Sequence, residues 1–167
     1  MQKIFTRRSV RNYTAEPVSD AAVTNFLKAA MAAPSAGNQQ PWEFIIVRDR
    51  DVLTEITKVH AYSQMLLEAA AAIVVCGDLK RSKYPLEYWV QDCSAATQNI
   101  LLAATAEGVG SCWLGIYPDS GRMAGVRSIL HIPEQIIPFS AVALGYPAKP
   151  PHPTDRFDPN RIHQGKW

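Results

Sequence analysis

The 167-residue sequence is 47% hydrophobic and 19% charged, which suits a single domain with an ordinary apolar core. Its net charge is only +2, with 17 basic residues spread along the chain, so the charge balance does not indicate a nucleic-acid or anionic-membrane partner. There is no signal-peptide pattern and no apolar run near the ~20 residues needed to span a bilayer, and we expect a cytoplasmic protein without membrane partners.

The sequence opens with an arginine-rich stretch, FTRRSVRNY, and then predicts its first helix. Ser19 is a typical N-cap, apolar residues follow at three- and four-residue spacing, and Pro34 marks the end. A turn-rich loop, PSAGNQQP, then leads to WEFIIVR, residues 42–48, whose apolar, β-rich run predicts a buried strand.

The middle of the chain predicts a helix, a strand and a longer helix in that order. Residues 51–69 favour one helix, or two with a break near Tyr62. AAIVVCGD, residues 71–78, is a short apolar run that ends in a turn signal and predicts a second strand. Residues 85–110 predict the longest helix, which is almost apolar around its second half and is therefore expected to be buried on most faces.

The last third of the chain predicts smaller elements and a tail. SCWLGIY, residues 111–117, favours a strand or an extended loop, residues 120–130 predict a helix, and residues 139–147 predict a strand. The proline-rich tail has little apolar periodicity, and we expect it to run extended over a surface. Strands that alternate with helices across short loops indicate a layered α+β or α/β domain.

Several common sites are not supported by the sequence. The three cysteines are an odd number at wide spacings, and the four histidines show no ligand spacing, so we expect buried, hydrophobic cysteines and no metal. No P-loop and no G-x-S-x-G elbow occurs. GVGSCW begins like a dinucleotide-binding motif, but Trp113 stands at the third glycine and the motif follows a helix.

Three polar or glycine-rich stretches remain as candidates for chemistry. In RRSVR, an extended backbone would place Arg7, Ser9 and Arg11 on one side, and a helix would place Arg7 and Arg11 together. Either conformation brings together two guanidiniums that suit a phosphate, although a solvated basic patch explains the same residues. PSAGNQQPW is also explained by a helix stop and a turn, and GVGSCWLG by a helix end before a buried strand.

Taken in order, these stretches resemble the short members of the nitroreductase family of flavin-dependent enzymes. The matching motifs are RRSVRNY, AAMAAPSAGNQQPWEFIIV, DCSAATQNILLAATAEGVGSCWLG and the ending LGYPAKPP…DRFDPNRIHQGKW, and they cover nearly the whole chain. The resemblance implies a single α+β domain, residues 1–167, with a mostly antiparallel sheet flanked by helices. It also implies a homodimer in which residues 147–167 form an extended strap on the partner.

The resemblance further implies an FMN site at the dimer interface. Contacts with the phosphate, ribityl chain and pyrimidine edge of the flavin are expected from Arg7, Arg8, Ser9 and Arg11, with Arg11 beside N1 and O2, and Arg156 is expected to complete the phosphate site. The partner subunit is expected to contribute Pro34, Ser35, Ala36 and Asn38. The backbone N–H groups of Leu114 and Gly115 are expected near N5 and O4, and Gln64 near the ring. No side chain is assigned a catalytic role, because the flavin carries the chemistry.

The implied activity is hydride transfer from NADH or NADPH to FMN, followed by reduction of nitroaromatic, quinone-like or other electron-poor molecules in a ping-pong reaction. The chain lacks the helical excursion with which longer relatives cover the flavin, which predicts a more open pocket. Two alternatives stay open: a flavin-binding module that stores or senses FMN without turnover, and a specialised enzyme of the same fold, such as a reductive dehalogenase or a flavin-destructase.

Overall fold

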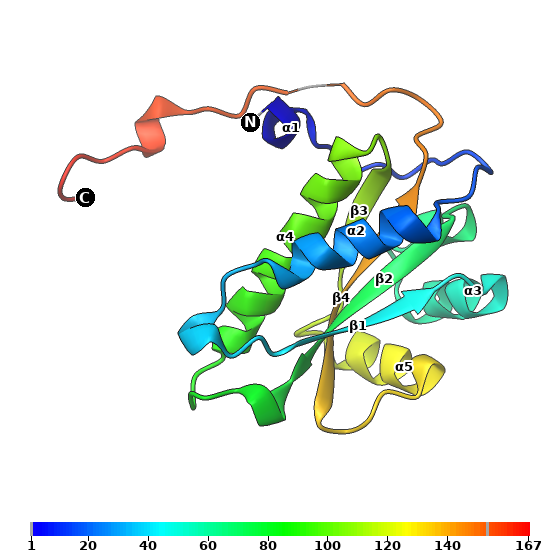
Figure 1. The fold of residues 1–167 in the computed structure, drawn as a ribbon, viewed down its shortest axis with the longest axis horizontal. Coiled ribbons are helices and arrows are strands. Elements are labelled where there is room, and N and C mark those ends of the chain that lie inside the picture. Colours follow the sequence, from blue (N-terminus) through cyan, green and yellow to red (C-terminus); the bar gives the residue numbers. More distant parts are fainter. Residues whose placement is uncertain (1, 153) are drawn as a thin grey trace.

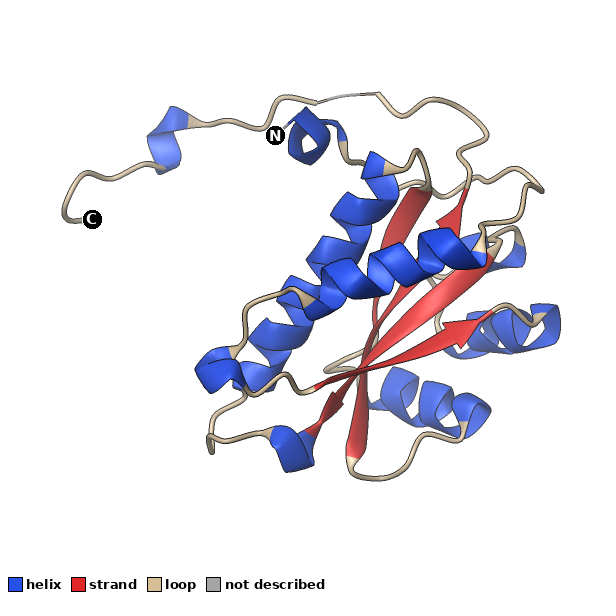
Figure 2. Cartoon of the chain, viewed as in Figure 1, coloured by secondary structure: helices blue, strands red, loops and turns tan. Residues whose placement is uncertain are grey.

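A four-stranded antiparallel sheet in the order β1-β2-β4-β3 forms the centre of the computed structural model, which describes residues 2–152 and 154–167 (Figure 2). Its strands are β1 (Trp42–Val47), β2 (Ala71–Asp78), β3 (Gly110–Gly115) and β4 (Ile136–Gly145). The two central strands are buried along almost their whole length, which explains why their sequences read as continuous apolar runs. β3 is an edge strand, so one side of its backbone faces away from the sheet.

Four longer helices cover the sheet in two layers (Figure 1). Helices α2 (Asp20–Met31) and α4 (Tyr88–Ala106) share one apolar core with the sheet, and α3 (Arg50–Val59) and α5 (Ser120–Leu130) share the other. Alternate β2 side chains feed the two cores, as the twofold period of a strand requires: Ile73 and Val75 lie with the first pair of helices, and Val74 lies with the second. The fold is therefore α+β with an antiparallel sheet between helices.

The shorter elements are a helix at the start of the chain and four 3₁₀ turns. They are α1 (Gln2–Thr6), η1 (Ala36–Asn38), η2 (Gln64–Leu67), η3 (Leu79–Arg81) and η4 (Pro159–Arg161). None of the residues of α1 is buried. A helix that buries no face needs no apolar residues at three- and four-residue spacing, which is why the sequence did not predict it. The tail beyond Pro147 is extended apart from η4, and its described residues are exposed except for the half-buried Asp158. Pro153 in this tail lies outside the described residues.

Most of the predicted elements are confirmed. The Ser19 hydroxyl accepts a hydrogen bond from the Ala22 N–H, which is the expected N-cap of α2. The strand alternative for residues 111–117 is correct, since β3 ends at Gly115. β4 begins at Ile136, three residues before the predicted start, and carries Pro138 where its register with β2 shifts. Proline lacks the N–H that a regular ladder uses, which is why this part of the strand was not predicted.

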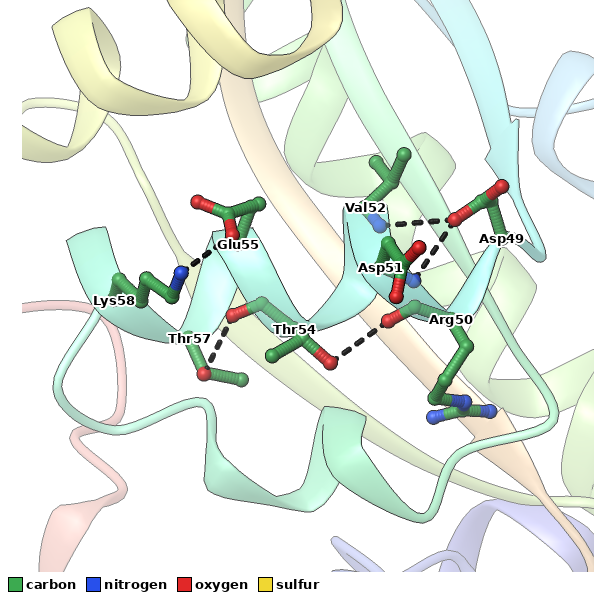
Figure 3. Close-up of polar contacts among 8 residues, drawn as sticks. All are labelled: Asp49, Arg50, Asp51, Val52, Thr54, Glu55, Thr57 and Lys58. Carbon is green, nitrogen blue, oxygen red and sulfur yellow. Dashed lines mark hydrogen bonds and ion pairs between the residues drawn. The ribbon is translucent and has the colours of Figure 1, made fainter.

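Helix α3 is fixed locally by polar side chains (Figure 3). Asp49 is its N-cap and accepts hydrogen bonds from the N–H groups of Asp51 and Val52, and the Thr54 hydroxyl donates to the Arg50 carbonyl. The helix ends at His60, whose backbone is extended, and the chain turns before η2. One continuous helix over residues 51–69 is therefore wrong, and the alternative with a break near Tyr62 is confirmed, with the 3₁₀ turn η2 as its second piece. His60 at this break is buried, with only 2% of the residue exposed.

The central helix α4 is the most enclosed helix, as predicted. Of its 19 residues, only Gln91 and Ala106 are exposed. Phe26 of α2 is fully buried in the core that α2 and α4 share with the sheet. The three cysteines are buried and free, and burial raises the pKa of each thiol, so the expectation that they are packing residues is confirmed. None of the helices in the described part of the chain is long and apolar enough to span a membrane.

We predict that Phe26→Ala lowers the free energy of unfolding by about 3–5 kcal/mol, because it leaves a cavity between α2 and α4. Urea unfolding followed by circular dichroism measures the change. The control Lys28→Ala removes an exposed side chain from the same helix and should stay within about 0.5 kcal/mol of the native protein. Equal losses in the two variants would show that α2 does not carry the core contact described here.

Candidate functional site

The arginine-rich segment leaves α1 after Thr6 and runs extended along the free edge of β3. Ser9 forms a parallel bridge with Ser111, and the Val10 N–H donates to the Ser111 carbonyl at 2.9 Å. Of the two conformations considered for RRSVR, the structure has the extended one. In this conformation alternation places Arg7, Ser9 and Arg11 on one side of the segment, and Ser9 and Arg11 line the same hollow.

The thiol of Cys112 lies near this group but is not set up as a nucleophile. It is 1% exposed, and burial raises its pKa. The charge of Arg11, a hydrogen bond with Ser9 and the charge of Arg7 all act in the opposite sense without outweighing burial. Cys112 therefore remains a packing residue beneath the arginines.

A pocket of about 430 Å³ opens beside β3 and brings together four of the predicted site residues, which are Arg11, Gln64, Leu114 and Gly115. The Leu114 side chain is 4% exposed and belongs to the core. In the regular register of β3 and β4 its backbone N–H and carbonyl point toward β4, so the structure does not support the expected contact from the Leu114 N–H. A Cβ built on Gly115 meets no atom within 4 Å and would project into open space. Gly115 thus leaves its backbone accessible from the pocket.

The same pocket is lined by residues that the sequence did not indicate, notably His60, Tyr62 and Arg122. The Gly115 carbonyl accepts hydrogen bonds from His60 Nε2 at 2.9 Å and from Arg122 Nη1 at 3.0 Å. His60 follows α3 and Arg122 lies in α5, so no spacing motif links them. They meet at Gly115 only because both helices pack on the same face of the sheet.

A second hollow, of about 590 Å³, lies between α1 and the tail and brings together Arg7, Arg8 and Arg156. Arg8 Nε donates to the His152 carbonyl at 2.8 Å, and Arg8 Nη2 donates to the Thr154 carbonyl at 2.9 Å. Arg8 therefore holds the tail against the start of the chain. Ser9 lies next to this region and lines a third hollow together with Arg11.

The remaining predicted residues, Pro34, Ser35, Ala36 and Asn38, lie in the loop between α2 and β1. Asp92 in α4 fixes this loop: its Oδ1 accepts from the Ala36 N–H at 2.9 Å and its Oδ2 accepts from Gln39 Nε2 at 2.6 Å. Asp92 is 4% exposed, and a buried carboxylate needs such donors. The sequence does contain a signal for this contact. Asp92 is an acidic residue next to the apolar positions Trp89, Cys93 and Ala96, which predicts a buried carboxylate that needs a partner.

The loop is held in an unusual backbone conformation. Gly37, Asn38 and Gln40 have φ angles of 52°, 52° and 47°, in the left-handed region that residues with a side chain rarely adopt. Such strain persists only where the surroundings impose it, and it concentrates at functional sites. Two lysine contacts add to the anchoring, since the Lys83 N–H donates to Gln39 Oε1 and Lys83 Nζ donates to the Gly37 carbonyl.

Within one chain, this loop and the arginine segment are far apart. The loop is bound to Asp92 near the start of α4, whereas Arg8 and Val10 line a hollow with Thr105, near the end of that helix. The 13 residues from Asp92 to Thr105 correspond to ~20 Å of helix. Figure 1 shows α1 and the loop after α2 at opposite ends of α4. A single copy therefore does not bring the two groups of predicted residues together.

Known proteins match this chain over its whole length. The model of the nitroreductase family matches residues 4–61 and 57–146. A relative from Archaeoglobus fulgidus, provisionally named NADH dehydrogenase/NAD(P)H nitroreductase, is 55% identical over 100% of this chain and 98% of its own. A crystal structure from Parabacteroides distasonis with the same provisional name has a TM-score of 0.95 at 40% identity and covers 99% of this chain and 97% of its own.

A third similar protein was solved with a ligand. It is a provisionally named nitroreductase from Desulfovibrio desulfuricans in complex with FMN, with a TM-score of 0.85 and 31% identity. The match covers 99% of this chain and 96% of that one. In the described part of the present chain, no three His, Cys, Asp or Glu side chains are grouped so that they could hold a metal ion.

We predict that Asp92→Asn loosens the loop and lowers the free energy of unfolding by about 1–3 kcal/mol. An asparagine has one acceptor where Asp92 uses two, and Gln39 cannot turn its own oxygen inward without losing the Lys83 N–H. Urea unfolding measures the loss, and limited proteolysis between residues 35 and 41 measures the loosening.

The control for this variant is Glu134→Gln, which neutralises an exposed carboxylate and should change neither readout. If Asp92→Asn were as stable and as protease-resistant as the control, Asp92 would not be the anchor of the loop.

Proposed function

Because the chain belongs to the nitroreductase family, we propose that it is an FMN-dependent oxidoreductase that takes hydride from NADH or NADPH. The name of the A. fulgidus relative and the FMN in the D. desulfuricans structure support this assignment. We propose that the electrons pass to nitroaromatic, quinone-like or other electron-poor small molecules, and that reductant and oxidant occupy the same pocket in turn. A cytoplasmic location stays a prediction.

The observation that carries the proposal is the pocket beside β3, whose residues fit a flavin. When bound, FMN supplies the hydride- and electron-transfer chemistry. Arg11 offers a cation that stabilises negative charge on the pyrimidine edge, and Gln64 offers an amide. Gly115 leaves space for a planar ring to approach its main chain. The chain itself contributes position and electrostatics, so no side-chain acid or base is required.

We assign the phosphate and ribityl end of the cofactor to the arginine segment. Arg7 and Arg156 provide guanidiniums on one hollow, and Ser9 adds a hydroxyl beside Arg11. Arg8 uses two of its donors on tail carbonyls, so its contribution is to hold the segment that carries Arg156. This division of roles follows from which donors are already engaged.

We further propose a homodimer in which each FMN site is shared between two copies. The strained Pro34–Asn38 loop lies ~20 Å along α4 from the arginine segment, so it can reach a site of this kind only on a second copy. The exposed tail and the exposed Phe5, Phe157 and Trp167 are explained if residues 147–167 form a strap on that copy. In this proposal residues 1–167 form one domain.

We predict that the purified protein is yellow and that anaerobic NADH or NADPH bleaches its flavin absorbance. Arg11→Ala should weaken FMN binding about 10- to 100-fold, because a charge-assisted contact is lost. Fluorescence titration of the flavin-free protein with FMN measures the affinity. Arg11→Lys keeps the charge and should lose less, and Lys58→Ala, which removes an exposed cation from α3, should behave as the native protein.

Two results would count against this reading. A protein that takes up no FMN would remove the cofactor assignment. A protein that binds FMN but is bleached by neither reductant would favour a binding or sensing module.

We predict that a heterodimer of two defective chains regains function. One chain carries Arg11→Ala and the other carries Asn38→Gly, which removes the side chain but suits the positive φ at this position. If each site draws Arg11 from one copy and Asn38 from the other, the heterodimer has one intact site and one doubly defective site. Co-expression with two affinity tags isolates it, and about half of the native FMN sites should return. Recovery no greater than the mean of the two homodimers would contradict a shared site.

A further inference from the structure

The Gly115 carbonyl receives two hydrogen bonds from side chains that the sequence keeps far apart. His60 Nε2 lies 2.9 Å from this oxygen and Arg122 Nη1 lies 3.0 Å from it. A carbonyl oxygen has two lone pairs, so both of its acceptor positions are used. Since a carbonyl can only accept, His60 Nε2 must carry a hydrogen, and His60 and Arg122 together form a clamp on Gly115.

Gly115 needs such a clamp more than its neighbours do. It is the last residue of β3, has no side chain to pack, and faces open space where its Cβ would be. The β3–β4 register is regular, and the Ser111 carbonyl points outward to Val10, so residues 111, 113 and 115 turn their backbone groups away from β4. In an extended strand, the N–H and the carbonyl of one residue point to the same side. While Gly115 keeps its extended conformation, holding its carbonyl therefore also restricts the direction of its N–H.

His60 is held rigidly for this task. It is 2% exposed, and its own carbonyl accepts hydrogen bonds from the Ser63 hydroxyl at 2.6 Å and from the Ser63 N–H at 3.0 Å. Its second ring nitrogen, Nδ1, is buried and has no hydrogen-bond partner among the described residues. A buried nitrogen without a hydrogen-bond partner costs free energy of folding, so a histidine at this position is not explained by packing alone.

Arg122 is fixed from three sides and connects the clamp to the mouth of the pocket. Its Nε lies 3.4 Å from Asp119 Oδ2, and its guanidinium carbon lies 5.7 Å from the centroid of the Tyr62 ring. Asp119 is also the N-cap of α5, since its Oδ1 accepts from the Arg122 N–H at 3.0 Å. Tyr62 is 74% exposed and lines the same pocket, so the arginine links Gly115 to an exposed residue of the pocket.

We propose that His60 and Arg122 are positioning residues that clamp the Gly115 carbonyl and thereby hold the Gly115 N–H toward the flavin. This inference rests on the proposed function, because it concerns the same pocket. Neither residue needs to touch the flavin. Each acts through the main chain of Gly115, and the two donors share one oxygen, so either one alone keeps part of the orientation.

The test compares four single variants and one double variant in the full-length protein. Arg122→Met keeps the length of the side chain and removes its donors, and His60→Met removes the ring donor. His60→Gln keeps an N–H donor at a similar reach and should rescue. Arg127→Met is the matched control, because Arg127 also donates to backbone carbonyls from α5, those of Ile132 and Pro133, but does not line the pocket.

The readouts are the FMN dissociation constant, the visible absorbance band of the bound flavin and the thermal midpoint of the flavin-free protein. We expect Arg122→Met to weaken FMN binding about 3- to 10-fold and to shift the flavin band. Its thermal midpoint should match that of Arg127→Met, which should leave the flavin unchanged. The double variant of His60→Met and Arg122→Met should lose more affinity than the product of the single losses, because only then is the carbonyl free.

The outcomes separate this inference from the proposed function. If the native protein binds no FMN, both fall. If it binds FMN and the band and affinity of Arg122→Met equal those of Arg127→Met, the clamp is wrong and the FMN assignment stands. His60→Met tests the other donor: a lower thermal midpoint with an unchanged flavin band, not rescued by His60→Gln, would make His60 a structural residue and overturn its part in the clamp.

Discussion

The buried helix α4 constrains the rest of the structure. The Pro34–Asn38 loop is fixed near its start, and the arginine segment and β3 lie near its end. Near its start, the carboxylate of Asp92 is buried and must find donors, and it finds them in the Ala36 N–H and in Gln39. Near its end, the chain passes through Gly108 directly into β3, which carries the other group of site residues. The length of the helix therefore sets the distance between the strained loop and the arginine segment, and this distance is the basis of the proposal that two copies share a site.

The free edge of β3 is the second feature that shapes the site. β3 has β4 on one side, and on the other side it contacts the arginine segment only near Ser111, so the outward side of its Gly115 end has no strand partner. Two cationic side chains, Arg11 and Arg122, line the pocket beside this edge, and Gly115 has no side chain to fill it. An anion-stabilising, sterically open edge is what a flavin requires from a protein that contributes position rather than acid–base chemistry.

The sequence was informative where periodicity or a motif reported the environment of a residue. The apolar runs of β2 and α4, the Ser19 cap and the break near Tyr62 all reflect local geometry, and the structure confirms them. The sequence did not predict α1, which buries no residue, or the first three residues of β4, where Pro138 interrupts the apolar run of the strand. His60 and Arg122 could not be found this way, because their meeting at Gly115 depends on how α3 and α5 pack rather than on spacing.

The measurement that bears most directly on this interpretation is the mass of the flavin complex in solution. Flavin-free protein is titrated with FMN while absorbance gives the stoichiometry and light scattering gives the molar mass. A site shared by two copies predicts one FMN per chain in a particle of twice the 18.5 kDa chain mass. An 18.5 kDa monomer that holds FMN tightly would contradict it, because one copy cannot bring the Pro34–Asn38 loop to Arg11.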